Sequence, residues 1–443
     1  MTTQKHIVVI GASVGGLVAA AELHAQGFKV TIVEKGQKVG GLFNKVQTPF
    51  GMQELGMHVL YVKDDHQRHL KQIFGGRAFH VLTGTRVDIG ASNNFGSTSF
   101  NSVYPVIQKP LRGTVLQEMI NASGSELIAN NAEQEATRRF GKTASERVVV
   151  PALEKLWKQS ARKLSSDSIH CFFDLRRLVV CDKQEADKFK RDAWLNQVLA
   201  NPDQLIPAGR VFDGRKGLVV RAEAATELNE KALRWAESND IDLKLSACVA
   251  VENGVVKIGD RPLSDEFDAA ILSMPLHSLA SESLERADSL EMSIYYLQAR
   301  GRVRSSFPSY YILCHDSSYH TSRIVNFDGY SCIDPASNNS VLAAEVLHEK
   351  GRAPEMESIA REVQRAVPAV EILKQYKLDK TLSVLSPTLK NAEILDGVTA
   401  SICQGQSVPM YFTGMRTDKG IFFSHHTVGL AYEAALDCKE QLT

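Results

Sequence analysis

The chain has 443 residues, of which 44% are hydrophobic and 23% are charged, proportions usual for a globular protein of two or three domains. Its 51 basic residues equal its 51 acidic ones, so the formal net charge at pH 7 is +0. This balance argues against broad electrostatic attraction to nucleic acid or to an anionic membrane.

Cysteine usage and the N terminus indicate the compartment. The 7 cysteines form no C-x-x-C pair and no metal-ligand spacing with histidine, so reduced thiols and no metal site are expected. The first residues lack the apolar segment of a signal peptide, and the most apolar stretch, residues 7–21, is too short to span a bilayer. We therefore expect a soluble cytoplasmic protein without a transmembrane segment.

The N-terminal residues predict a βαβ unit. Residues 6–10 are a continuous β-branched run that ends at a glycine, as in a buried strand. Residues 14–26 are rich in alanine and leucine and are followed by Gly27, which indicates a helix and its end. Residues 29–34 are a second buried strand, so a right-handed crossover joins a parallel pair.

The rest of the chain alternates between helical and strand patterns. Helices are expected within residues 116–136, 145–164, 184–199 and 218–238, and a last one at 428–441. Strands are expected at residues 209–212, 242–252, 255–258, 267–273 and 410–413, with antiparallel strands between 290 and 350. The pattern predicts an α/β fold in which a Rossmann-type domain is assembled from residues 1–60, 208–280 and 400–443. Residues 61–207 and 281–399 would form an inserted α+β substrate domain, with a helical insertion and an antiparallel sheet.

The turn between the first strand and helix reads Gly-Ala-Ser-Val-Gly-Gly over residues 11–16. Dinucleotide-binding turns have glycine at the first, third and sixth positions, for a tight turn, close approach of the pyrophosphate and helix packing. Gly11 and Gly16 fill the first and sixth positions, Ser13 replaces the third, and Gly15 adds a small residue. The Ser13 hydroxyl can donate to a phosphate oxygen, and the helix N terminus supplies N–H groups. The alternative is a tight turn in an ordinary α/β domain.

A glutamate and a second glycine pair follow. Glu34, at the end of the second strand, is placed to accept hydrogen bonds from an adenosine ribose. Glutamate followed by Gly40-Gly41 resembles the FAD-dependent superfamily that includes amine oxidases, protoporphyrinogen oxidase, phytoene desaturase and UDP-galactopyranose mutase. The resemblance implies FAD rather than NAD as the cofactor, bound in part by Lys35 and Leu42. Many members have arginine after the Gly-Gly, and Leu42 in its place removes a charge contact with the phosphate.

Later segments extend the resemblance. Residues 54–61 resemble the segment that passes the isoalloxazine ring, and residues 244–251, with Val249, resemble the strand whose backbone meets the adenine. Residues 268–275 match a family strand that ends in proline. Gly414 and Met415, and the following helix with Val428, resemble the C-terminal segment that caps the flavin. The two insertions match only loosely.

Three sets of side chains are candidates for chemistry. His58 is expected near flavin N5 or the ring face, where a histidine titrating near neutrality can tune the ring or move a proton; the alternative is a structural histidine. Arg323 can bind an anionic substrate or abut the flavin; the alternative is an exposed strand arginine. His425 and His426 would precede the last helix near the flavin if Thr427 caps it; the alternative is a solvated loop pair.

Two larger sets carry weaker expectations. A basic run can meet a diphosphate or simply face solvent, and a group of tyrosines can line a substrate pocket or pack in a sheet. The arginines are Arg300, Arg302 and Arg304, and the tyrosines are Tyr295, Tyr296, Tyr310 and Tyr311.

Three functions remain open. The first is an FAD-dependent oxidoreductase that transfers hydride from a small-molecule substrate to flavin N5. The second is a non-redox flavin-dependent mutase whose substrate is a sugar nucleotide, favoured by the residue 54–61 segment and by Arg323. The third is a catalytically silent FAD-binding partner protein.

Overall fold

The computed structural model describes residues 4–82, 90–122, 128–202, 216–221, 224, 226–279, 281–330, 337–379 and 381–442. The expected βαβ unit is confirmed. Strand β1 (His6–Ile10) pairs in parallel with β2 (Lys29–Val33), and helix α1 (Val14–Ala25) joins them. Gly27 follows the helix with φ +88°, the left-handed conformation that glycine adopts at helix ends.

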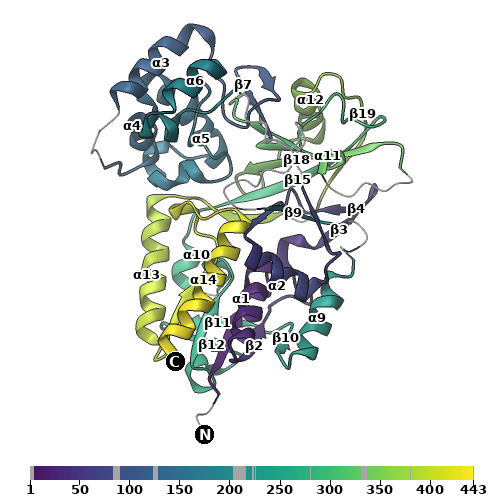
Figure 1. Cartoon of the computed structure of the whole chain (residues 1–443), viewed down its shortest axis with the longest axis vertical. Helices are drawn as coiled ribbons and strands as arrows, with labels where there is room; N and C mark the ends of the chain where they lie inside the picture. Colours follow the sequence, from purple (N-terminus) through teal and green to yellow (C-terminus); the bar gives the residue numbers. More distant parts are fainter. Residues whose placement is uncertain are drawn as a thin grey trace.

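A five-stranded parallel sheet forms the centre of the lower unit in Figure 1. Its order is β10 (Asp242–Lys244), β2, β1, β14 (Ala269–Leu272) and β21 (Met410–Phe412). Every neighbouring pair is parallel. The strands come from three distant parts of the chain, as the sequence predicts for a Rossmann-type domain.

The two faces of this sheet bury alternate residues of β1, the period-two pattern of a strand covered on both sides. Ile7 and Val9 pack in a core with α1, α2 (Asp64–Phe74), α9 (Leu228–Ser238) and α14 (Ser424–Leu442). Val8 and Ile10 pack in a second core with β12 (Val255–Ile258) and α13 (Leu389–Gly405). The small elements beside that second core are β11 (Val249–Glu252), β13 (Arg261–Pro262) and α10 (Glu282–Glu285).

An Asn-Gly turn joins β11 to β12. Asn253 and Gly254 have φ of +51° and +80°, as a two-residue type I′ hairpin turn requires. The pair is antiparallel, with Glu252 opposite Val255. The hairpin expected from the sequence is confirmed.

The upper unit is built on an eight-stranded sheet. The strands lie in the order β19 (Ile372–Lys377), β15 (Ser289–Ala299), β18 (Ser340–His348), β17 (Arg323–Asn326), β16 (Tyr311–Cys314), β7 (Ala91–Asn94) and β8 (Ser97–Ser99), and β20 (Leu382–Leu385) also pairs with β15. All neighbours are antiparallel except β16 and β7. The antiparallel sheet expected between residues 290 and 350 is therefore present.

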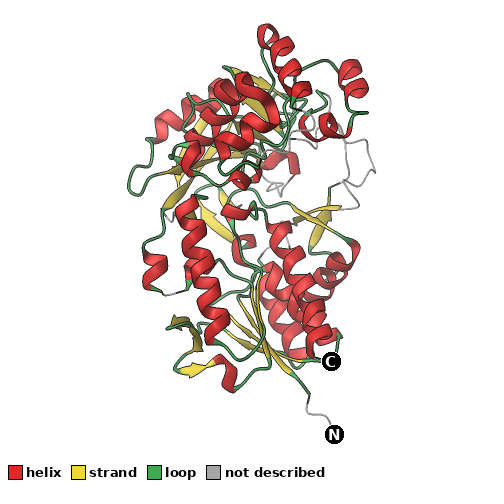
Figure 2. Cartoon of the chain, turned by 90° about the vertical axis from the view of Figure 1, so that its left-hand side faces the viewer, coloured by secondary structure: helices red, strands yellow, loops and turns green. Residues whose placement is uncertain are grey.

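Helices cover both faces of this sheet (Figures 1 and 2). Helix α12 (Met356–Ala366) packs on one face. A helical group packs on the other and shares its core with Leu313 and Leu347. It consists of α3 (Lys109–Asn121), α4 (Ala132–Ala144), α5 (Val150–Trp157), α6 (Lys183–Phe189) and α7 (Ala193–Val198).

Short sheets join the two units. A hairpin of β3 (Lys45–Thr48) and β4 (Gly51–Glu54) follows the βαβ unit, and a second small sheet has the order β5 (Leu60–Val62), β9 (Lys216–Val220), β6 (Phe79–Val81). Leu60 and Ala78 are part of the core around α1, and α13 lies in the core on the other face of the parallel sheet. We therefore propose that the first segment of the lower unit ends near residue 81 rather than 60, and that the third begins near 389 rather than 400.

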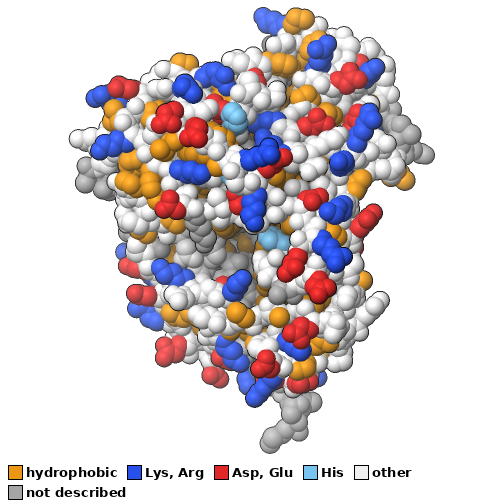
Figure 3. Space-filling view, turned by 180° about the vertical axis from the view of Figure 1, so that it is seen from behind, with side chains coloured by type: hydrophobic (Ala, Val, Ile, Leu, Met, Phe, Trp, Pro, Cys, Tyr) orange, Lys and Arg blue, Asp and Glu red, His pale blue; other side chains and the backbone are white. Residues whose placement is uncertain are grey.

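Other sequence expectations differ in their bounds. The helices expected at 116–136 and 145–164 are shorter and interrupted, because α3 ends at Asn121 and α5 at Trp157. The last helix begins at Ser424, not at Val428. The strand expected at 209–212 lies outside the described residues. No helix among the described residues is both long and apolar enough to cross a bilayer, and acidic and basic side chains are interspersed on the face shown in Figure 3.

Candidate functional site

The turn between β1 and α1 allows no side chain at two positions. Gly11 has φ +100°, and a Cβ on it would lie 2.7 Å from the Ser273 carbonyl oxygen. A Cβ on Gly16 would lie 2.0 Å from the Gly11 carbonyl oxygen. Gly15 packs against α14, since its Cβ would lie 3.2 Å from the Thr427 carbonyl oxygen. The glycines therefore bring the start of α1 close to β14 and α14, as dinucleotide-binding turns require.

The N terminus of α1 retains free donors. Ser13 caps the helix, because its Oγ accepts a hydrogen bond from Gly16 N at 3.2 Å, and this oxygen also lies 3.1 Å from Ser273 Oγ. The hydroxyl expected to meet a phosphate is thus already engaged in capping. The N–H groups of Val14 and Gly15 make no hydrogen bond to any described residue. They face the region where the helix dipole favours an anion.

Glu34 organises the edge of this turn. Its Oε2 accepts a hydrogen bond from Ala12 N at 2.8 Å, and its Oε1 accepts one from Gly36 N at 2.7 Å. A carboxylate has about four acceptor positions, so both oxygens can still accept from a ribose hydroxyl. Lys35 is exposed beside it.

The segment before β11 lies next to Glu34. Ala247 N donates to the Glu34 carbonyl oxygen and Ser246 N donates to the Gly36 carbonyl oxygen, both at 3.0 Å. Val249 begins β11 directly after this contact. These hydrogen bonds thus place the segment that resembles an adenine-contacting strand next to Glu34, the residue expected to bind the ribose.

The second glycine pair lies against the first turn. Gly40 and Gly41 have φ of +94° and +57°, and Gly40 N donates to the Ala12 carbonyl oxygen at 2.8 Å. A Cβ on Gly41 would lie 3.7 Å from the Ser13 Cα. The Leu42 side chain is 45% exposed and supplies no charge. We call Gly11, Ser13, Gly15, Gly16, Glu34, Gly40 and Gly41 the cradle.

The segment that follows β21 approaches the cradle from the side of β14, the strand that pairs with β1 opposite β2. Gly414 packs against β14, since a Cβ on it would lie 1.9 Å from the Met274 carbonyl oxygen. The partly buried Met415 follows it. Val428 is 1% exposed, and its side chain packs in the core with α1 rather than facing a ligand.

Other side chains of this segment and of the basic run have partners within the protein. Arg416 is buried and paired with Asp418 at 2.6 Å and Asp396 at 2.8 Å, so its charge is neutralised. Thr427 does not cap α14, because the helix starts three residues earlier and its Oγ1 donates to the Ser424 carbonyl oxygen. His425 and His426 accordingly lie in the first helical turn, not in a loop. Arg300 pairs with Glu371, and Arg302 with Asp328.

His58 is held neutral. Its Nε2 lies 2.7 Å from the Leu55 carbonyl oxygen, which can only accept, so Nε2 carries the proton and Nδ1 is an unprotonated acceptor. Burial lowers the pKa of His58 to about 4. The expectation that this histidine titrates near neutrality is therefore wrong for this fold. Phe43, two residues after Gly41, packs on His58 with ring centroids 5.3 Å apart.

Arg323 is buried and paired, not exposed on its strand. Its guanidinium contacts the Glu345 carboxylate at 2.7 Å, and both side chains are nearly inaccessible, at 12% and 1%. Glu345 Oε1 also accepts a hydrogen bond from Met57 N at 2.9 Å. A Cβ on Gly56 would lie 2.8 Å from the same oxygen. Glu345 thus connects the upper sheet to the loop that carries His58.

Aromatic contacts continue from Arg323 back to the lower unit. The guanidinium lies over the Phe172 ring at 5.0 Å, and Phe172 contacts Phe422 at 5.5 Å. Phe423 stacks on His425 at 5.6 Å, and His425 contacts Tyr61 at 5.8 Å. We call this set the seam cluster. It consists of Phe43, His58, Tyr61, Phe172, Arg323, Glu345, Phe422, Phe423 and His425.

The seam cluster lies where ligands bind in open parallel sheets. It begins after β2 and ends in the helix after β21, so it borders the carboxyl ends of these strands. Its central members come from the upper unit. The described residues include no cluster of three or more possible metal ligands.

The sequence did not indicate the roles of three residues in this region. Glu345 and Phe172 are not among the candidates, and Tyr296 is named only within a group of tyrosines. Glu345 lies in a run of buried apolar strand residues, where a lone acid is an unusual signal. Phe172 has φ +53°, which no sequence pattern predicts. Tyr296 donates to the Glu54 carbonyl oxygen at 2.6 Å and so ties the upper sheet to the residue 54–58 loop.

Comparison with known proteins agrees with this geometry. A family model described as an NAD(P)-binding Rossmann-like domain matches residues 9–75. The zeta-carotene-forming phytoene desaturase of Myxococcus xanthus is 38% identical over 87 residues, which are 20% of this chain and 17% of that protein. Sequence likeness to curated relatives thus spans only a small part of either chain.

Solved structures match over nearly the whole chain. A reduced UDP-galactopyranose mutase has a TM-score of 0.68 at 16% identity, covering 100% of this chain and 96% of that one. A putrescine oxidase variant has a TM-score of 0.58 at 13% identity, covering 99% of both. The chain therefore has the fold of these two proteins, with a Rossmann-like domain at its N-terminal end.

Proposed function

We propose that this protein is an FAD-dependent oxidoreductase in which a small-molecule substrate loses a hydride to flavin N5. The observation that carries the proposal is the continuity between the cradle and the seam cluster. The Gly40-Gly41 turn packs on the first turn, and Phe43, two residues later, packs on His58. A dinucleotide held at the cradle would therefore extend toward the aromatic rings and the Arg323–Glu345 ion pair of the seam cluster.

The chain's residues supply binding, orientation and exclusion of water. The N–H groups of Val14 and Gly15 suit a pyrophosphate, and the Glu34 carboxylate suits a ribose. FAD bound there would supply the hydride acceptor. His58 contributes an acceptor at Nδ1 and no proton at neutral pH, because Nε2 donates to Leu55. Its role is to orient a donor group of the substrate or cofactor.

A sugar-nucleotide mutase is the second candidate, favoured by the whole-chain likeness to a UDP-galactopyranose mutase. Such chemistry would need a cation for the substrate diphosphate. Arg323, the sequence candidate for that task, is already neutralised by Glu345, and the Phe172 ring lies against its guanidinium. This pairing favours the oxidoreductase.

The visible absorption spectrum tests the cofactor. Protein incubated with FAD and separated from free FAD is expected to keep a flavin spectrum; a colourless protein contradicts the proposal. Anaerobic mixing with amines, porphyrinogens and polyenes, the classes that the superfamily suggests, is expected to bleach the flavin with one of them. Conversion of a UDP-sugar to its furanose by the reduced protein would establish the mutase instead. FAD retention with neither reaction would favour the silent partner protein.

A further inference from the structure

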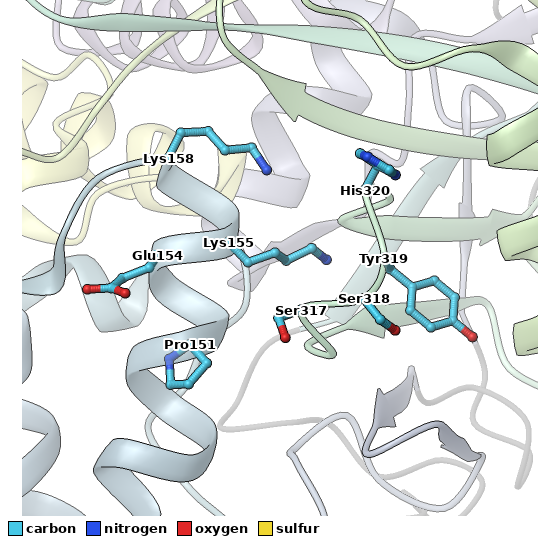
Figure 4. A pocket seen from close by; sticks show the side chains of 8 residues that line it. All are labelled: Pro151, Glu154, Lys155, Lys158, Ser317, Ser318, Tyr319 and His320. Atoms are coloured by element: carbon cyan, nitrogen blue, oxygen red, sulfur yellow. The ribbon is translucent and has the colours of Figure 1, made fainter.

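A pocket of about 440 Å³ lies away from the cradle, in the upper unit. It opens between helix α5 and the loop of residues 315–322 that joins β16 to β17 (Figure 4). Lys155, Lys158, Ser317 and His320 line it. No member of the cradle or of the seam cluster does.

Lys155 places a buried positive charge at this pocket. The residue is 9% exposed, and its Nζ donates to the Cys314 and Thr321 carbonyl oxygens at 2.5 and 2.6 Å. An ammonium has three N–H groups, so one remains. No carboxylate of the described residues lies within ion-pair distance of this Nζ, and burial lowers the pKa of Lys155 to about 8.

The neighbouring carboxylates are occupied by other donors. The two Glu362 oxygens accept from the backbone N–H groups of His320 and Thr321 and from both side chains. Asp316 accepts from the N–H groups of Ser318 and Gly96. The acids near Lys155 therefore stabilise the loop rather than pair with the ammonium.

Glu154 also lines the pocket, but its carboxylate has another partner. Its carboxylate accepts from Ala161 N at 2.9 Å, and Figure 4 shows its side chain directed away from Lys155.

More donors face the same space. Lys158 directly follows the last residue of α5, and Figure 4 shows the ammonium groups of Lys155 and Lys158 directed toward the loop. Within the described parts of the chain, Lys158 Nζ has neither a hydrogen bond nor an ion pair. His320 uses Nδ1 for Glu362, which leaves Nε2 for a ligand. The exposed Ser317 hydroxyl makes no hydrogen bond to a described residue.

We propose that this pocket binds a phosphate-type oxyanion, either free or as the phosphoryl group of a small metabolite. Two ammonium groups, an imidazole and a hydroxyl approach from two different elements, which suits the several acceptors of a tetrahedral anion. Lysine serves there as a point charge. Because Lys155 already joins α5 to both ends of the loop, the anion would brace the helical group against the sheet.

Calorimetric titration of the FAD-saturated protein with inorganic phosphate, in chloride-poor buffer at pH 7, tests the proposal. Saturation with FAD keeps phosphate from the cradle. We expect one site in the unmodified protein. Lys158→Met is expected to weaken binding by about tenfold or more, because a charged hydrogen bond is lost. Lys155→Met is expected to do the same, and Lys142→Met, whose side chain is 77% exposed on the neighbouring helix, is expected to leave binding unchanged.

Two outcomes would overturn the proposal. Absence of phosphate binding to the unmodified protein does so directly. Equal affinity in Lys158→Met and the unmodified protein would place the anion elsewhere. Lys158 is only partly buried, so its variant remains informative even if Lys155→Met fails to fold. A glycerol phosphate that binds more tightly than inorganic phosphate would identify a phosphorylated metabolite as the ligand.

Discussion

Removal of the Glu345 carboxylate is expected to destabilise the protein strongly. In Glu345→Ala, the Arg323 guanidinium loses its partner at 2.7 Å while its side chain stays 12% exposed. Arg323 Nε already lacks a hydrogen-bond partner in the described structure. Breaking a buried ion pair from one side costs about 3–5 kcal/mol, because an uncompensated charge remains. The Met57 N–H also loses its acceptor.

An exposed pair at the edge of the same sheet is the matched control. Arg300 and Glu371 form a similar contact at 2.7 Å, but their side chains are 65% and 59% exposed. Solvent and salt screen such pairs, so Glu371→Ala is expected to change the free energy of unfolding very little. Both variants remove a glutamate carboxylate from an arginine, and the two ion pairs differ mainly in how deeply they are buried.

Urea unfolding followed by circular dichroism measures both variants, and FAD titration reports on the loop that Glu345 anchors. A double variant, Arg323→Met with Glu345→Leu, is expected to recover most of the lost stability, since it leaves no buried charge. Equal losses in Glu345→Ala and Glu371→Ala would refute the reasoning. So would a double variant as unstable as Glu345→Ala.

Two further predictions concern the cradle and its neighbour. Gly16→Ala is expected to abolish FAD retention, because its Cβ would lie 2.0 Å from the Gly11 carbonyl oxygen. The control Gly76→Ala should retain FAD, because no atom lies within 4 Å of its Cβ. If the absorption spectra show equal FAD retention in both variants, the prediction is contradicted. The pKa of His58, lowered to about 4 from 6.5, means that the unfolded chain binds more protons between these values. The contribution of the neutral His58 to the free energy of unfolding should therefore be fully present above pH 6.5. It should be lost as the pH falls toward 4, by up to roughly 3 kcal/mol. Between pH 4 and 6.5, the free energy of unfolding of His58→Gln should depend less steeply on pH than that of the unmodified protein. A His58 imidazole NMR signal that titrates near 6.5 would contradict the prediction.

Local spacing was enough to predict the elements that carry the cofactor site. The glycines at 11 and 16, the β-branched run before them and Glu34 after the second strand act within one βαβ unit, whose geometry follows from backbone sterics and helix ends. The Asn253-Gly254 turn is similar, because positive φ at both positions determines the hairpin. Motifs spread over three segments also predicted that distant strands share one sheet.

Tertiary structure alone decided what the side chains at the other end of the site do. Arg323 and Glu345 are neutralised by each other, Met57 is held by an acid 288 residues away, and Arg416 turns inward to Asp418 and Asp396. His58 is neutral because of its burial, which no spacing in the sequence expresses. Local conformation depends on neighbouring residues and can be predicted from them. Charge pairing and pKa depend on desolvation and on partners that only the packed chain brings together.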